Sequence, residues 1–121
     1  LNATESNNYE ISKLLLENGA DVTAANFEDG TTPLMHSSYN NDTEPTKLLL
    51  EHNADPDLGN KYGDTALHMA CRKGYTNIVK LLLEHNADHN VENKFMGANT
   101  PLKLALREGH KEIVYLLQKN K

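Results

Sequence analysis

Cysteine, tryptophan and long apolar runs are scarce or absent in this sequence, and each absence excludes a class of protein. Cysteine occurs once, as Cys71, so no internal disulfide can form and we expect a reducing compartment. No apolar run approaches the roughly 18 residues of a membrane-spanning helix, and the first residues lack the regions of a signal peptide. We therefore expect a protein of the cytoplasm, with the nucleus as the alternative, that does not enter a membrane.

Positive charge is also in short supply. The 12 Lys and Arg residues face 17 Asp and Glu residues, which leaves a net charge of −5. No overall positive field would attract nucleic acid, so we expect none as a partner. The chain begins at Leu1 instead of methionine, from which we expect either an excised fragment or a missing upstream segment.

Arrangements typical of catalysis are missing as well. We find no Ser–His–Asp set, no paired carboxylates and no Walker-type glycine loop. His85, Asp88 and His89 could be taken for metal ligands, but the pattern described next places His85 at a helix end and His89 in a loop, with no third ligand specified. We therefore predict a non-catalytic protein with no cofactor and no metal.

What the sequence does contain is an internal repeat. The segment KLLLEHNAD at Lys80 recurs at Lys47 and, as KLLLENGAD, at Lys13, with a worn copy, YLLQ, at Tyr115. The leucine triplets are spaced by 34, 33 and 35 residues. A fixed period of this size indicates stacked units that contact only their neighbours.

Each full unit is predicted to hold two helices followed by a polar loop. Thr32, Thr65 and Thr100 are placed to cap the first helix, and proline suits the next position in two of the units. Thr76 is expected to cap a second helix. Gly or Asn residues then end the helices in a left-handed conformation, namely Gly19, Asn53, Asn86, Gly74, Gly109 and Asn41.

The second unit departs from this pattern. Pro45 stands where the later units have Ile78 and Ile113, and Thr46 replaces Val79. Apolar packing is lost at both positions, so we predict that this unit is the weakest part of the stack.

These segments resemble a known family. TALHMA at Thr65, Gly74, IVKLLLE at Ile78 and the Ala87-Asp88 pair with Asn90 closely resemble the ankyrin repeat, and the resemblance covers roughly residues 9–121. It implies a mainly α solenoid of stacked antiparallel helix pairs with projecting β-hairpin fingers. We expect one domain, 1–121, made of a truncated first repeat at 1–29, repeats at 30–62 and 63–97, and a C-terminal repeat at 98–121.

The sequence departs from the family pattern at one position in two repeats, and its last repeat has a polar character of its own. Met35 and Lys103 replace the histidine that hydrogen-bonds between loops in the family, so only His68 can make this contact. The last repeat carries polar residues that suggest a natural end of the stack, namely Lys111, Glu112, Gln118, Lys119 and Lys121.

The resemblance implies a protein-binding scaffold that holds a peptide or protein in its concave groove and along its fingers. Aromatic residues in the finger loops support this, since exposed rings beside polar neighbours are typical of binding hot spots; alternatively, each ring could lie flat on the adjacent finger. The predicted partner-binding residues are Phe27, Glu28, Tyr39, Asn40, Lys61, Tyr62, Arg72, Lys73, Lys94, Phe95, Arg107 and Glu108.

Two other functions stay open. The repeats could space the domains of a longer protein and bind nothing, or they could recruit the substrate of a larger enzyme, as in a microbial effector or a ligase adaptor. We expect a monomer.

Asn90 occupies the position at which some members of the family resemble substrates of an asparaginyl hydroxylase. At most one repeat of this chain has asparagine at that position.

Overall fold

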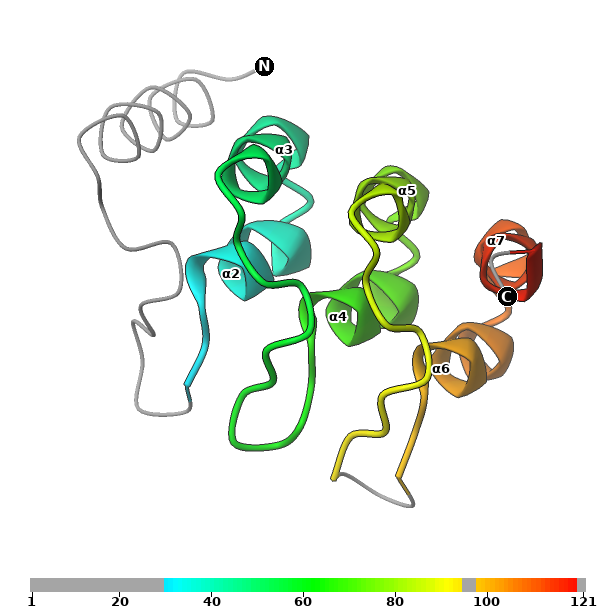
Figure 1. The fold of residues 1–121 in the computed structure, drawn as a ribbon. Helices are drawn as coiled ribbons and strands as arrows, with labels where there is room; N and C mark the ends of the chain where they lie inside the picture. The colour runs from blue at the N-terminus through cyan, green and yellow to red at the C-terminus, as the bar shows by residue number, and fades with distance from the viewer. Residues whose placement is uncertain (1–29, 95–97, 120–121) are drawn as a thin grey trace.

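The structure, a computed structural model, describes residues 30–94 and 98–119 (Figure 1). These residues form three helix pairs along the chain: α2 (Pro33–Tyr39) with α3 (Thr43–Glu51), α4 (Ala66–Lys73) with α5 (Thr76–Glu84), and α6 (Pro101–Glu108) with α7 (Lys111–Lys119). The predicted first repeat, with Phe27 and Glu28, lies outside the described residues, as does Phe95.

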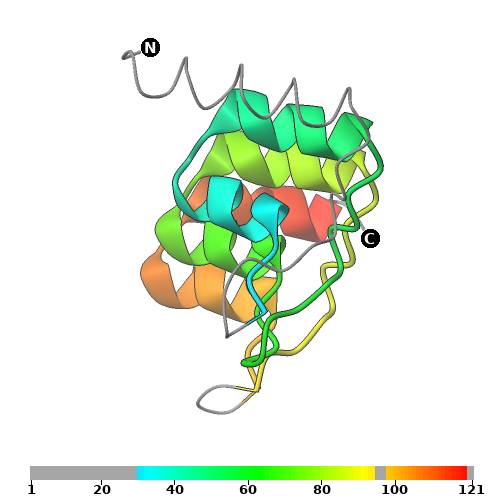
Figure 2. The same ribbon diagram turned by 90° about the vertical axis from the view of Figure 1, so that its left-hand side faces the viewer.

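The helices form two layers (Figure 1). One layer holds α2, α4 and α6, the other holds α3, α5 and α7, and each helix contacts its partner and its neighbours in the same layer. The loops that follow α3 and α5 project from one end of the helices, as the view in Figure 2 makes plain. The predicted solenoid of stacked helix pairs is confirmed.

The predicted caps of the first-layer helices are confirmed. Thr32 Oγ1 accepts a hydrogen bond from the Met35 N–H at 3.3 Å, and Thr100 Oγ1 accepts one from Lys103 at 3.2 Å. The prediction for Thr76 is wrong. Helix α5 begins at Thr76 itself, and Tyr75 holds the cap position without a side-chain hydrogen bond.

Left-handed residues separate the helices as predicted. Asn53 and Asn86 have φ values of 67° and 64° after α3 and α5. Asn41, which stands in the place of Gly74, has a φ of 58°. Asparagine tolerates this conformation better than other side chains do, so the turn survives without glycine.

The core runs between the two layers. Leu67, Ile78, Val79 and Leu82 are fully buried, and Ala70 lies on the side of α4 that the neighbouring helices cover. A small side chain at this point lets the helices of the first layer approach closely. The leucine and small residues that recur in each repeat are therefore the residues that pack the core, as their period predicted.

The second unit replaces part of this core with hydroxyl groups. Thr46 is fully buried, and its Oγ1 lies 2.8 Å from Ser37 Oγ and donates to the Asp42 carbonyl at 2.8 Å. Ser38 is also buried, and its Oγ has no hydrogen-bond partner in the described part of the chain. In place of apolar packing, this unit therefore holds one satisfied hydroxyl pair and one unsatisfied hydroxyl.

The fingers are turn-closed loops. The Asn60 N–H donates to the Asp64 carbonyl at 3.0 Å, and the Gly63 N–H donates to Asn60 at 2.9 Å. Neighbouring fingers are joined where the Lys94 N–H donates to the Tyr62 carbonyl at 2.7 Å. No strand forms in residues 30–94 or 98–119, so the β-hairpin form of the fingers is not confirmed.

The last described unit exposes Lys111, Glu112, Gln118 and Lys119, as expected, and it also exposes a leucine. Leu106 is 57% exposed, although the residues at its position in the earlier units, Ser38 and Cys71, are fully buried. Those two are covered by the next helix pair, whereas Leu106 belongs to the last one described. Within the residues that the structure covers, no helix is long and apolar enough to cross a membrane.

Candidate protein-interaction surface

Nine of the predicted partner-binding residues are described. They lie at the C-terminal ends of α2, α4 and α6 and in the described parts of the two finger loops. We call this set the candidate surface: Tyr39, Asn40, Lys61, Tyr62, Arg72, Lys73, Lys94, Arg107 and Glu108.

Tyr39 and Lys73 connect two helices across this surface. Tyr39 is the last residue of α2 and Lys73 the last of α4, so the packing of α2 against α4 brings the two side chains together. The Lys73 ammonium lies 4.6 Å from the centroid of the Tyr39 ring. The ring is nevertheless 49% exposed. It therefore offers an oriented aromatic face beside a positive charge.

Tyr62 repeats the arrangement at a finger tip. The Lys61 ammonium lies 5.1 Å from the Tyr62 ring centroid, and the ring is 38% exposed. The backbone bond between Lys94 and Tyr62 holds the tip against the next finger. This exposure leaves most of the ring covered, so the alternative expected from the sequence, a ring lying on the adjacent finger, stays open for Tyr62.

Arg72 is committed to the fold. Its Nη2 donates to both carboxylate oxygens of Asp64 at 3.3 Å, and Asn93 Nδ2 donates to Asp64 Oδ1 at 2.9 Å. Asp64 and Asn93 are buried. Arg72 therefore ties the end of α4 to the bases of two fingers, and its charge is compensated.

Arg107 holds the same place one unit later. Its Nη2 donates to Asn99 Oδ1 at 2.9 Å, and Asn99 stands where the previous unit has Asp64. Unlike Arg72, Arg107 forms no ion pair with the residues that the structure describes. The guanidinium is exposed and is held by a neutral amide.

A buried network of polar residues under the surface was not predicted from the sequence. Asp64, Asn93 and Asn99 connect the finger bases to the helices. A signal for it was present, because an Asp or Asn directly precedes the capping threonine in two units, and an Asn precedes Lys61 and Lys94.

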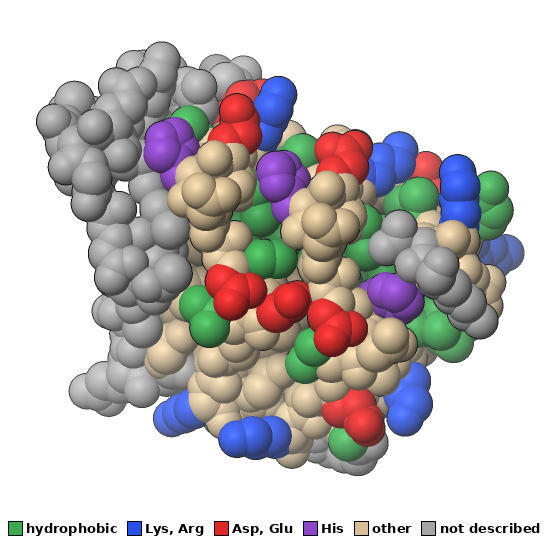
Figure 3. All heavy atoms as spheres, viewed as in Figure 1, with side chains coloured by type: hydrophobic (Ala, Val, Ile, Leu, Met, Phe, Trp, Pro, Cys, Tyr) green, Lys and Arg blue, Asp and Glu red, His purple; other side chains and the backbone are tan. Residues whose placement is uncertain are grey.

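The side of the loops seen in Figure 3 has a different character. Acidic and histidine side chains gather there over the loops. Asp55 Oδ1 accepts from the Asp57 N–H at 2.9 Å, and Asp57 Oδ1 accepts from the Asp88 N–H at 2.7 Å. These carboxylates stabilise the turns after α3 and α5 and join one loop to the next.

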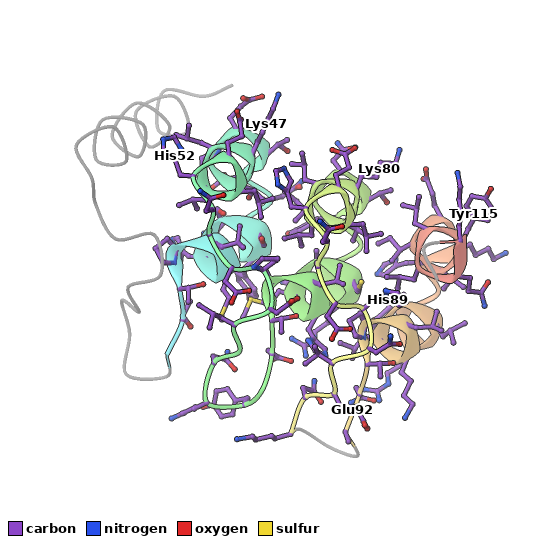
Figure 4. All side chains as sticks on the ribbon, in the orientation of Figure 1. Lys47, His52, Lys80, His89, Glu92 and Tyr115 are labelled. Atoms are coloured by element: carbon purple, nitrogen blue, oxygen red, sulfur yellow. The ribbon has the colours of Figure 1, made fainter. Side chains whose placement is uncertain are left out.

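Residues with catalytic or metal-binding potential lie apart. Burial raises the pKa of the Cys71 thiol to about 12, so it stays protonated and a poor nucleophile. In residues 30–94 and 98–119, no group of three His, Cys, Asp or Glu side chains is placed to hold a metal ion. Figure 4 shows His89 and Glu92 on the loop after α5, and Lys47, Lys80 and Tyr115 on the second-layer helices.

Comparison with known proteins places this architecture in a family. A family model described as ankyrin repeats, in three copies, matches residues 1–93. The chain is also similar to an ankyrin repeat protein of Acanthamoeba polyphaga mimivirus, with 55% identity over 40 residues. That match spans 33% of this chain and 30% of the viral protein. Ankyrin repeats are generally protein–protein interaction modules and typically lack catalytic activity. The chain belongs to the ankyrin repeat family.

Proposed function

We propose that this chain binds a protein or an extended peptide through the candidate surface and carries out no chemistry on it. The carrying observation is the pair of exposed tyrosines, Tyr39 and Tyr62, each beside a lysine ammonium and each on a different element. Rings of this kind supply contact area at low cost in conformational entropy, and they dominate the energy of many interfaces.

The surface is prepared for a partner before binding. Arg72 and Asp64 hold the base of the first described finger, and the Lys94–Tyr62 backbone bond holds its tip. A surface that is already ordered loses less entropy when the partner arrives. The fold therefore supports recognition of a partner along several elements at once. Asn40 and Glu108 belong to this surface, and Phe27, Glu28 and Phe95 are proposed to extend it.

The test begins with selection from a displayed library of random peptides on the purified chain. The selected peptides are then titrated against Tyr39→Ser and Tyr62→Ser. We expect affinity to fall about tenfold or more for at least one variant. Unfolding free energies should change by no more than about 1 kcal/mol, because both rings are on the surface.

Tyr115→Ser is the matched control. Tyr115 is 62% exposed and lies 6.0 Å from the Lys119 ammonium, but it belongs to α7 in the second layer. It reproduces the chemistry of the other two sites away from the candidate surface. Equal affinity losses in all three variants, or no selected peptide, would contradict the proposal, and the second result would favour a segment that only spaces the domains of a longer protein.

We further propose that the chain acts as a monomer in the cytoplasm or the nucleus and does not bind nucleic acid. Its net charge of −5 supports the last point. Sedimentation at several protein concentrations tests the first, and titration with labelled single- and double-stranded nucleic acid tests the last.

A further inference from the structure

Two arginines at equivalent positions of successive units have different partners. Arg72 follows Asp64 by the same number of residues as Arg107 follows Asn99, and each arginine donates from Nη2 to the residue that precedes its helix cap. In the first pair the acceptor is a carboxylate, 3.3 Å away, and in the second it is an amide oxygen, 2.9 Å away. The exchange of Asp for Asn leaves the geometry and removes the counter-charge.

Arg107 therefore carries a positive charge that the described fold does not neutralise. Glu108 follows it in sequence, but no ion pair joins the two side chains. Residues 95–97, which precede Ala98 and Asn99, contain no acidic side chain. The guanidinium is exposed, and it is oriented by a buried residue, since Asn99 is only 6% exposed.

The candidate surface to which Arg107 belongs carries more positive than negative side chains. Lys94 on the neighbouring finger is exposed, as are Lys61 and Lys73 elsewhere on the candidate surface. Acidic side chains are present too: Asp64 is paired with Arg72, Glu108 follows Arg107, and the exposed Glu92 precedes Lys94 by two residues. On a chain whose net charge is −5, this surface is a local exception and attracts anionic groups.

We propose that Arg107 is the anchor for a carboxylate side chain, Asp or Glu, of the bound peptide, an inference that rests on the proposed function. Asn99 occupies one Nη2 donor and orients the guanidinium, and the remaining N–H groups face the partner. A planar fork of donors matches a carboxylate in a two-point contact. The peptide thus supplies at Arg107 the counter-charge that Asp64 supplies at Arg72.

The experiment uses the full chain and peptides selected on it from the random library. The sequences of the selected peptides should be enriched in Asp or Glu at one position. Changing that residue to Asn or Gln should weaken binding about tenfold. Arg107→Gln should lower the affinity for the acidic peptide by a similar factor. The two changes together should cost little more than either one alone, which shows that the two side chains contact each other.

Asn99→Asp is the sharper variant. It replaces the side-chain amide NH2 with a carboxylate oxygen of nearly the same size, so it adds a negative charge without adding bulk. The variant thereby recreates at Arg107 the internal pair that Asp64 forms with Arg72. We expect it to leave the thermal melt unchanged or raised and to abolish the preference for the acidic peptide over its amide form. Lys119→Gln, on α7, removes one positive charge from another face and should preserve the preference.

The outcomes separate the two proposals. Peptides that depend on Tyr39 or Tyr62 but show no acidic preference, or a preference that survives Asn99→Asp and Arg107→Gln, would overturn the role of Arg107 and leave the binding surface standing. If no peptide is selected, or binding ignores both tyrosines, the proposed function fails and this inference fails with it.

Discussion

His68 donates its Nε2–H to the carbonyl oxygen of Asn99, 3.0 Å away on the next finger base. The other ring nitrogen, Nδ1, accepts from the Thr65 N–H at 3.1 Å, which fixes the tautomer. The ring is fully buried and neutral, and it connects the start of α4 to the residue before the cap of α6. The sequence predicted that only His68 could make this contact between loops, and the structure confirms it for the described residues.

The first prediction is a loss of stability in mild acid. Desolvation by burial lowers the pKa of His68 below its usual 6.5, and hydrogen bonding to Asn99 only partly opposes this. In the unfolded chain the ring takes up a proton near pH 6.5, whereas the folded chain resists it. The stability contributed by the neutral ring is therefore complete above pH 6.5 and is lost as the pH falls from there through the lowered pKa.

Denaturant melts at a series of pH values check this, with His68→Gln as the variant. His68→Gln should be less stable near neutral pH by about 1–3 kcal/mol, because buried partners lose their hydrogen bonds. It should also show a shallower fall in stability below pH 6.5. His52→Gln, at an exposed position, should keep the wild-type slope. Identical slopes for wild type and His68→Gln would contradict the assignment.

The second prediction compares two glycines with the same backbone conformation. Gly74 and Gly109 have φ values of 79° and 73°. A Cβ at Gly74 would lie 2.6 Å from His110 Cε1, whereas one at Gly109 meets nothing within 4 Å. Alanine at either position adds backbone strain of about 1–2 kcal/mol. At Gly74 it also displaces His110, whose Nε2 donates to the Arg72 carbonyl at 3.3 Å.

Gly74→Ala should therefore unfold at a lower denaturant concentration than Gly109→Ala. We expect their free energies of unfolding to differ by about 1 kcal/mol, because the displaced His110 ring loses one hydrogen bond. The double variant Gly74→Ala/His110→Ala should recover part of it, because the clash is gone. Equal stability of the two single variants would show that His110 moves aside without cost.

The third prediction concerns the unsatisfied hydroxyl of the second unit. Ser38 is fully buried and its Oγ has no hydrogen-bond partner within the described residues, so the group loses its hydration without compensation. Ser38→Ala should raise the free energy of unfolding by about 1 kcal/mol. Ser37→Ala, which breaks the 2.8 Å contact with Thr46, should lower it instead. Equilibrium melts of both variants distinguish the two hydroxyls, and destabilisation by Ser38→Ala would contradict this prediction.

Hydrogen exchange should show the same unevenness along the stack. Amides of α2 and α3 are expected to exchange faster than those of α4 and α5, where Cys71 and Val79 take the places of Ser38 and Thr46. In Ser38→Ala the exchange of α2 should slow.

Much of the fold could be predicted because the same local sequence signals recur in each repeat. The capping threonines, the buried leucines and the left-handed Asn53 and Asn86 follow from local chemistry that recurs in register. Where one unit stood alone, prediction failed. Thr76 lies one residue inside its helix, and the exposure of Leu106 depends on whether another helix pair covers it.

The candidate surface was less predictable, because pairing depends on side-chain reach between units. Sequence reasoning placed Arg72, Lys73 and Arg107 together in one set of partner-binding residues. In the structure Arg72 holds Asp64, Lys73 covers Tyr39, and Arg107 donates to Asn99. Only a pairwise comparison of Asp64 with Asn99 could have signalled the difference.

The last prediction separates Arg72 from its neighbour Lys73. Removing the Arg72 guanidinium leaves the buried Asp64 carboxylate with Asn93 as its remaining side-chain partner. The Arg72 side chain is 38% exposed, so water screens part of the pair and its value is modest. We expect Arg72→Gln to lower the free energy of unfolding by about 1–2 kcal/mol through the stranded carboxylate. Lys73→Gln loses only an exposed cation–π contact, so its free energy of unfolding should stay within about 0.5–1 kcal/mol of wild type.

Denaturant melts of both variants check the assignment. Arg72→Gln/Asp64→Asn serves as the rescue, because the double variant removes the stranded charge. If Lys73→Gln is the more damaging change, or the double variant is no better than Arg72→Gln alone, then Arg72 does not hold the finger base through Asp64.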